Sequence, residues 1–212
     1  MADTESRSPA PTLPLDLAAY VARGLSFDQY VGEIDRLVES GRTSGPDQLP
    51  ALVDYTRLNR QRMRRLVATV TLAPDTVAVV GAAKVDWVWL VITEAWCGDS
   101  AQCLPTVEKI AALNPGVRTR YVWRDENPAL MDRYETDGKR VIPKLICLDA
   151  RTHAEVWTWG PRPTRAMAYF KEMQAQGLPG KARAENMQRW YLADGQQSIQ
   201  ADFRERFQPV PR

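Results

Sequence analysis

Ten residues near the middle of the chain, EAWCGDSAQC beginning at Glu94, have the residue types and spacing of a thiol site. An aromatic residue, Trp96, leads directly into Cys97, and a glycine follows. A cysteine thiolate can attack a disulfide and form a mixed disulfide. A redox pair would have its second cysteine three residues later, but Ser100 stands there, and the next cysteine is Cys103. The stretch therefore indicates a dithiol, a single-cysteine site or a redox fold that has lost its chemistry.

The residues after Cys97 predict opposing effects on its pKa. A free thiol titrates near pH ~8.5. Cys97 precedes a predicted helix at 98–113, and the free N–H groups and positive dipole end at a helix N-terminus lower a thiol pKa. Ser100 can donate a hydrogen bond to the sulfur, whereas the Asp99 carboxylate repels a thiolate and takes up the same N–H groups. We favour a functional thiol over a cysteine that only fits a tight strand-to-helix junction.

Apolar patterns predict the elements that position this stretch. The run DWVWLVITEAW at 86–96 is continuously apolar and β-branched, which is typical of a strand covered on both faces. Asn127 followed by Pro128 is a cap with proline at the first helical position. IPKLICLD and EVWTW are two short strands joined as a hairpin. The core is expected in the order β-α-β-α-β-β-α, at 86–96, 98–113, 117–123, 128–136, the two hairpin strands and 163–176.

Extra helices are expected before and after this core. Ser26 and Gln29 form a capping box at the start of a helix at 26–40, and helices at 49–71 and 74–83 follow. The tail at 181–207 is helical again, with a break at Gly195. We expect four segments: a disordered lead-in at 1–14, an N-terminal helical arm at 15–73, an α/β domain at 74–178 and a C-terminal helical extension at 179–212.

The order of elements, together with WCGDS, RDENP and VIPKLICLD, resembles the thioredoxin family. The likeness covers about residues 74–178 and implies a thioredoxin-like domain there. The whole chain, helical arm included, looks like a bacterial branch of thioredoxin-like proteins whose site reads Trp-Cys-Gly-Asp-Ala/Ser. The features that carry the resemblance are Trp96-Cys97-Gly98, the turn of Asp125, Asn127 and Pro128, then Ile142-Pro143, and Gly160 after the last strand.

The resemblance implies a substrate site around Cys97. It implies a cis peptide bond at Pro143 that faces the sulfur, with the backbone of Ile142 open to an extended peptide by strand addition. Without the resemblance a trans proline would be expected, since only ~5% of X–Pro bonds are cis. It also implies that the loop carrying Arg162 lies beside the cysteine, where this cation offsets Asp99. The implied substrate-binding residues are Trp96, Gly98, Asp99, Ile142, Pro143, Gly160 and Arg162.

Two positions depart from the thioredoxin pattern. Ser100 replaces the resolving cysteine, and Val91 stands where many thioredoxins bury an aspartate that takes protons from that second thiol. On a helix at 98–113, Cys103 lies about 240° around the axis from Cys97 and roughly 9 Å along it. A disulfide needs Cα atoms within about 7 Å, so we expect two separate free thiols, with Cys103 in the core. The alternative is a resolving Cys103 that is reached by local unwinding of the helix.

Composition and charge argue against several other classes. The formal net charge of +2 is too small to indicate a nucleic-acid partner, and Arg57, Arg60 and Arg64 on one helical face are expected to be solvated and salt-bridged. No stretch approaches the ~20 apolar residues that span a bilayer, and the N-terminus lacks a signal-peptide pattern. Three cysteines argue against a secreted disulfide framework, so we expect a cytoplasmic protein. With His153 as its only histidine, we expect no metal site and no cofactor.

Two functions stay open on the sequence. The favoured one is thiol–disulfide exchange or thiol reduction through Cys97 alone, with an external thiol resolving the mixed disulfide. The protein would then be a thiol–disulfide oxidoreductase whose partners are protein or small-molecule thiols and disulfides. The alternative is a redox-inactive thioredoxin-fold module that binds protein partners beside Pro143. The Cys97 pKa separates them, because a value below about 7.5 favours the enzyme and one above ~8.5 favours the module.

Overall fold

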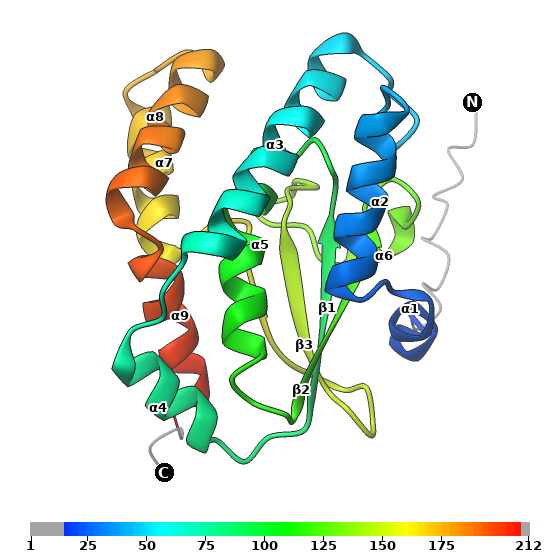
Figure 1. The fold of residues 1–212 in the computed structure, drawn as a ribbon, viewed down its shortest axis with the longest axis vertical. Coiled ribbons are helices and arrows are strands. Elements are labelled where there is room, and N and C mark those ends of the chain that lie inside the picture. Colours follow the sequence, from blue (N-terminus) through cyan, green and yellow to red (C-terminus); the bar gives the residue numbers. More distant parts are fainter. Residues whose placement is uncertain (1–14, 209–212) are drawn as a thin grey trace, which may run out of the picture.

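A four-stranded mixed sheet forms the centre of the computed structural model, which describes residues 15–208 (Figure 1). β1 is parallel to β2 and antiparallel to β3, and β3 is antiparallel to β4. The parallel pair requires a crossover connection, which α5 (Gly98–Ala111) supplies. The strands are β1 (Trp87–Thr93), β2 (Val117–Trp123), β3 (Lys144–Asp149) and β4 (Glu155–Trp159), in the spatial order β2-β1-β3-β4.

Helices lie before, between and after the strands. The expected α/β fold with extra helices at both ends is therefore confirmed. β1 ends at Thr93, earlier than expected, because the next residues turn the chain into α5. α6 ends at Arg133 rather than 136, because Tyr134 leaves the helical conformation. The remaining helices are α1 (Leu17–Arg23), α2 (Phe27–Glu39), α3 (Pro50–Thr69), α4 (Pro74–Ala82), α6 (Pro128–Arg133), α7 (Thr164–Ala175), α8 (Gly180–Asp194) and α9 (Gln197–Phe207). The expected disordered lead-in at 1–14 lies outside the described residues.

The sheet is covered on both faces, which explains the continuous apolar run of β1. Trp89 and Val91 point to one face and join the core formed with α2, α3, α5 and α9. Leu90 and Ile92 point to the other face and pack against α1 and α6. Figure 1 shows α2, α3 and α5 in front of the sheet and α7, α8 and α9 beside them. Alternate residues of one strand therefore serve two separate hydrophobic clusters.

The helices outside the β1-to-α7 core contribute to these clusters. Phe203 of α9 lies 5.0 Å from Trp89 between ring centroids, and Tyr30 of α2 stacks on Tyr121 of β2 at 5.0 Å. α3 packs along α5, so it lies directly over the helix that begins at Cys97. Within residues 15–208, no single helix is long and apolar enough to cross a membrane; α3 and α4 meet that test only together, across an 88° bend.

Candidate functional site

Cys97 is the N-cap residue of α5, where β1 delivers the chain to the first turn of the helix. Its sulfur accepts a hydrogen bond from the Ser100 N–H at 3.5 Å and donates one to the Ile142 carbonyl at 3.4 Å. The Ile142–Pro143 peptide bond is cis. Sheet register brings these segments together, because Ile92 of β1 is paired with Lys144 of β3. The loop after β1 and the loop before β3 therefore lie side by side and meet at the sulfur.

The environment of Cys97 holds its thiol in the protonated form. Burial, and after it the charge of the Asp99 carboxylate, raise the pKa of Cys97 to about 11. The Ser100 hydroxyl and the backbone N–H groups of Ser100 and Asp99 act in the opposite direction but do not outweigh burial. Because this pKa lies well above neutral pH, almost all of the thiol is protonated there, and the Cys97 residue is only 7% exposed.

Ser100 connects the site to the interior of the protein. It is fully buried, and its hydroxyl oxygen accepts a hydrogen bond from the Thr93 hydroxyl at 2.8 Å. The Thr93 oxygen also lies 3.3 Å from the Tyr30 hydroxyl of α2. The residue that stands in place of a second cysteine is therefore part of a buried hydroxyl chain that links α2, β1 and α5.

Asp99 and Arg162 meet beside the cysteine, as the resemblance to thioredoxins implied. The Arg162 guanidinium lies 2.5 Å from the Asp99 carboxylate, and it also lies 4.0 Å above the Phe170 ring of α7. The Tyr191 hydroxyl of α8 donates to the same carboxylate at 2.9 Å. The Asp99 carboxylate is thus paired with a cation and held by groups from two other segments, the loop after β4 and α8.

Cys103 and Cys97 lie in different hydrophobic clusters, on the two faces of the sheet. Both are free thiols, but Cys97 belongs to the cluster with α1 and α6, whereas Cys103 belongs to the core between the sheet and α3, α8 and α9. Cys103 is fully buried and its sulfur donates to the Tyr191 hydroxyl at 3.6 Å. Burial raises its pKa well above the ordinary value, and Asp99 adds to that effect.

Gly160 fixes the distance between two loops. A Cβ atom at this position would lie 2.2 Å from the Pro143 carbonyl oxygen, and the Gly160 φ of +110° is one that other residues rarely adopt. The next peptide bond, Gly160–Pro161, is also cis. The residues of this loop that line the groove above Cys97 are Pro161 and Arg162.

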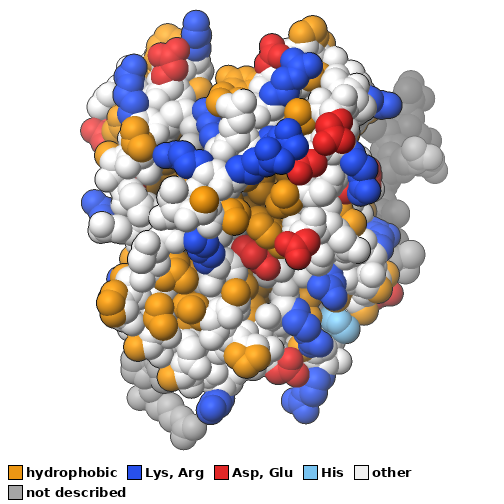
Figure 2. Space-filling view, in the orientation of Figure 1, with side chains coloured by type: hydrophobic (Ala, Val, Ile, Leu, Met, Phe, Trp, Pro, Cys, Tyr) orange, Lys and Arg blue, Asp and Glu red, His pale blue; other side chains and the backbone are white. Residues whose placement is uncertain are grey.

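A groove of about 630 Å³ lies above the sulfur, with α3 on one side and α8 on the other. Cys97, Gly98, Asp99, Trp96 and Ile142 line its floor. The space-filling view shows arginine and lysine side chains on both sides of the hollow between these helices (Figure 2). The walls contain residues that sequence reasoning missed, among them Arg62 of α3 and Gln188 of α8.

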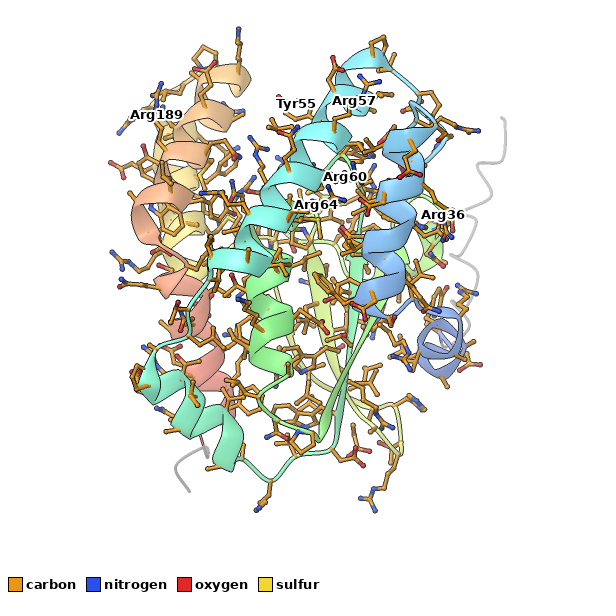
Figure 3. All side chains as sticks on the ribbon, in the orientation of Figure 1. Arg36, Tyr55, Arg57, Arg60, Arg64 and Arg189 are labelled. Atoms are coloured by element: carbon orange, nitrogen blue, oxygen red, sulfur yellow. The ribbon has the colours of Figure 1, made fainter. Side chains whose placement is uncertain are left out.

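The outer face of α3 differs from the wall of the groove. Figure 3 shows Tyr55 on the side of α3 toward α8, whereas Arg60 and Arg64 lie toward α2. Arg60 and Arg64 both pair with Asp35 of α2, and the distance for Arg64 is 3.4 Å. These outer arginines are salt-bridged, as the sequence predicted. Arg62 lies on a different side of the same helix and lines the groove.

Glu94 is a second buried titratable group that sequence reasoning did not single out. Its carboxyl is fully buried, accepts a hydrogen bond from the Ser44 hydroxyl and accepts another from the Asp125 N–H at 2.9 Å. Burial raises the pKa of Glu94 to about 7. The Ser44 oxygen also accepts from the Ala95 N–H at 2.8 Å. Glu94 therefore ties the loop before α3 to the turn that presents Cys97.

In the part of the chain that the structure describes, no group of three histidine, cysteine or acidic side chains is arranged so that it could hold a metal ion. His153 lies in the hairpin turn between β3 and β4, and Cys147 is fully buried in β3.

Comparisons with known proteins bear on the fold and the family. A family model described as thioredoxin matches residues 45–174, a span that begins before α3. Two solved structures are similar. A crystal structure of an HIV epitope-scaffold has a TM-score of 0.57 at 16% identity, covering 89% of this chain and 94% of its own. A protein of unknown function, PA1234 from Pseudomonas aeruginosa, has a TM-score of 0.53 at 16% identity, covering 89% and 99%. Among curated proteins, none matches this sequence significantly.

Proposed function

Because this chain belongs to the thioredoxin family, we propose that Cys97 carries out thiol–disulfide exchange as a single reactive cysteine. The observation that carries the proposal is the position of its sulfur, at the N-terminus of α5, 3.4 Å from the Ile142 carbonyl and on the floor of the groove. A substrate strand that lies along Ile142 brings its own sulfur to this point.

The proposed reaction has two exchange steps. In the first, Cys97 loses its proton to water and its thiolate attacks one sulfur of a substrate disulfide. A bond forms between these two sulfurs, the substrate disulfide breaks, and the other sulfur leaves and takes up a proton. In the second, the thiolate of an external thiol attacks the substrate-derived sulfur of the mixed disulfide. A new disulfide forms between them, and Cys97 is released to take up a proton.

The external thiol, protein or small molecule, is the co-substrate of this cycle. A reducing compartment such as the cytoplasm keeps such thiols available, and we propose it as the setting. The partners are thiols and disulfides of proteins or small molecules. Under this proposal Ser100 has no redox role, and Cys103 stays reduced throughout.

The pKa of Cys97 favours a second candidate. A value of about 11 lies above the ~8.5 of a free thiol, which is the condition expected of a redox-inactive module that binds protein partners in the groove. Under the exchange proposal the resting thiol is protonated and reacts slowly, until a bound substrate holds its sulfur at Cys97 and proximity compensates for the low thiolate fraction.

The test uses a cysteine-containing peptide that carries a chromophoric thiol as a mixed disulfide, with an external thiol in solution. Release of the chromophore is followed with wild type, Cys97→Ser and Cys147→Ser, the last being a control in the buried strand. We expect wild type and Cys147→Ser to accelerate the release and Cys97→Ser to have no effect. Peptide binding without acceleration by wild type would support the binding module instead.

A further inference from the structure

The groove above Cys97 is lined by more positive than negative side chains. The acidic residues in its lining are Asp99 and Glu185. The basic residues are Arg62, Arg124, Arg140, Arg162, Lys181 and Arg183. They come from α3, α8 and three loops, which follow β2, precede β3 and follow β4, so the fold gathers this charge at one place. The whole chain has a formal net charge of only +2. The excess of positive charge in the groove therefore does not simply reflect the composition of the chain.

Three of these cations are paired with carboxylates. Arg162 pairs with Asp99 at 2.5 Å, and the structure also pairs Arg124 with Asp125 at 2.7 Å and Arg140 with Asp132 at 2.5 Å.

Arg62 and Arg183 are different, because their hydrogen-bond acceptors are neutral. Arg62 donates to the Asn59 side-chain oxygen at 3.1 Å, and Arg183 donates to the Leu178 carbonyl. Across residues 15–208, neither guanidinium has a carboxylate within 4.0 Å.

Both arginines are partly removed from water without a counter-ion. Arg62 is partly buried, and burial lowers its pKa. The Nε atom of Arg183 is buried and has no hydrogen-bond partner. Desolvating a cation without pairing it costs free energy. A bound anion that completes these hydrogen bonds would recover part of that cost.

The position of Arg62 points to an anion next to the reactive sulfur. A Cβ atom at Gly98 would lie 3.7 Å from a terminal guanidinium nitrogen of Arg62 and 3.7 Å from the side-chain nitrogen of Gln188. These two donors thus approach the first turn of α5 from α3 and from α8. Gln188 is oriented by Gln102, whose amide nitrogen donates to its oxygen at 2.7 Å.

The same groove has an apolar wall that a small inorganic anion would leave uncovered. Tyr55 and Leu58 of α3 are 46% and 40% exposed there, and Leu52 and Phe170 also line the groove. Its volume of about 630 Å³ exceeds what one carboxylate needs. A ligand that covers both features would combine negative charge with apolar side chains over an extended length.

We propose that this groove binds an extended acidic peptide segment, whose carboxylates are held by Arg62 and Arg183 and whose sulfur lies at Cys97. This inference names the substrate class of the exchange reaction proposed above and rests on that function for the role of the sulfur. Charged hydrogen bonds to partly buried arginines supply the selectivity, and the apolar wall of α3 supplies further contact area.

The test measures peptide binding to the full-length Cys97→Ser protein by fluorescence polarisation. One labelled peptide has a central cysteine flanked by glutamates and leucines, and its matched control has glutamines in place of the glutamates. We expect the acidic peptide to bind at least about tenfold more tightly, since two charge-assisted hydrogen-bond sites distinguish the pair. Equal affinities for the two peptides would overturn the proposal.

Arginine variants locate the binding. Arg62→Gln and Arg183→Gln should each weaken binding of the acidic peptide by about fivefold or more. The affinity for the glutamine peptide should stay within about twofold of wild type. The matched control is Arg189→Gln, on α8 but facing away from the groove in Figure 3, which should change neither affinity. Thermal melting of each variant checks that it folds. A loss with Arg189→Gln equal to that with Arg183→Gln would overturn the assignment.

Two further ligands separate the peptide from other anions. Glutarate should displace the acidic peptide only weakly, and a single-stranded oligothymidylate of equal net charge should bind less tightly than the peptide. Binding of either as tightly as the peptide would overturn the proposal in favour of a small-anion or nucleic-acid site.

Exchange kinetics keep this inference distinct from the proposed function. With the disulfide forms of both peptides, wild type should react faster with the acidic one. Equal rates would overturn the inference and leave the exchange function standing. Selective binding of the acidic peptide without exchange would overturn the function and leave the binding site standing.

Discussion

Arg162 and Asp99 form an ion pair with 2.5 Å between Nη2 and Oδ2, and each side chain is 15% exposed. Asp99 lies two residues after Cys97 in the first turn of α5, and its charge raises the Cys97 pKa. Arg162 therefore controls the thiol indirectly, by neutralising the carboxylate that opposes the thiolate.

Substitutions of this pair should move the Cys97 pKa in opposite directions. Asp99→Ala removes the repelling charge and should lower the pKa, whereas Arg162→Ala leaves that charge unpaired and should raise it. A shift of about one unit corresponds to about 1.4 kcal/mol. The pH dependence of iodoacetamide alkylation, with the modified cysteine identified by mass spectrometry, measures the effect. Asp54→Ala, which removes a surface ion pair with Arg57, is the control, and an unchanged profile in both test variants would exclude this electrostatic link.

The buried Glu94 should make stability depend on pH. Its folded pKa of about 7 exceeds the ordinary 4.5, so between these values the unfolded chain releases a proton that the folded protein keeps. The free energy of unfolding should fall as pH rises from about 4.5 to about 7, by roughly 3 kcal/mol for this group. Above about pH 7, Glu94 causes no further change in the free energy of unfolding.

Glu94→Gln should remove this decline. Urea unfolding at several pH values measures the free energy of unfolding, and Glu126→Gln, at an exposed acidic position, is the matched control. A Glu94→Gln protein whose stability falls across this window as steeply as wild type would show that the Glu94 carboxyl is not the group responsible.

Gly160 should tolerate no side chain. Gly160→Ala combines an unfavourable φ of +110° with a Cβ contact of 2.2 Å to the Pro143 oxygen, and it should cost about 3 kcal/mol of stability. Gly138→Ala is the matched control, since Gly138 also has a positive φ but open space around its Cβ position, and it should cost about 1 kcal/mol. Denaturant unfolding compares the two. Equal losses would mean that the loops carrying Gly160 and Pro143 do not pack closely.

The helical arms should be required for folding of the α/β segment. A fragment of residues 74–178 lacks α3, which packs on α5, and α9, whose Phe203 packs on Trp89. The exposed apolar faces should make this fragment aggregate or lose fixed tertiary packing. Near-ultraviolet circular dichroism and light scattering measure both effects. A soluble monomer with native-like aromatic signals would contradict the expectation and make 74–178 an independent domain.

Local patterns were sufficient to predict much of the fold. The continuous apolar run of β1 and the proline at the start of α6 each depend on residues close together in the chain, and the structure has both elements, although the Asn127 side chain makes no capping hydrogen bond. α1 escaped prediction as a separate helix because it is only seven residues long and almost wholly apolar, which is too short a stretch to show a helical period.

The walls of the groove depend on packing between distant segments. Sequence reasoning noted the cluster of arginines on α3, but only the packing of α3 on α5 decides that Arg62, rather than Arg60, faces Cys97. Glu94 lies within the thiol stretch itself, yet its buried partner Ser44 is 50 residues away. Partners at such separation leave no local periodic signal.

Oxidation of the folded protein tests the single-cysteine mechanism most directly. Wild type, Cys103→Ser and Cys97→Ser are treated with diamide in the presence of a cysteine peptide, digested without reduction and analysed by mass spectrometry. Wild type and Cys103→Ser should both form a mixed disulfide between Cys97 and the peptide, and Cys97→Ser should form none. A dominant intramolecular disulfide between Cys97 and Cys103, with exchange activity lost in Cys103→Ser, would contradict the mechanism and make this a dithiol protein whose helix unwinds.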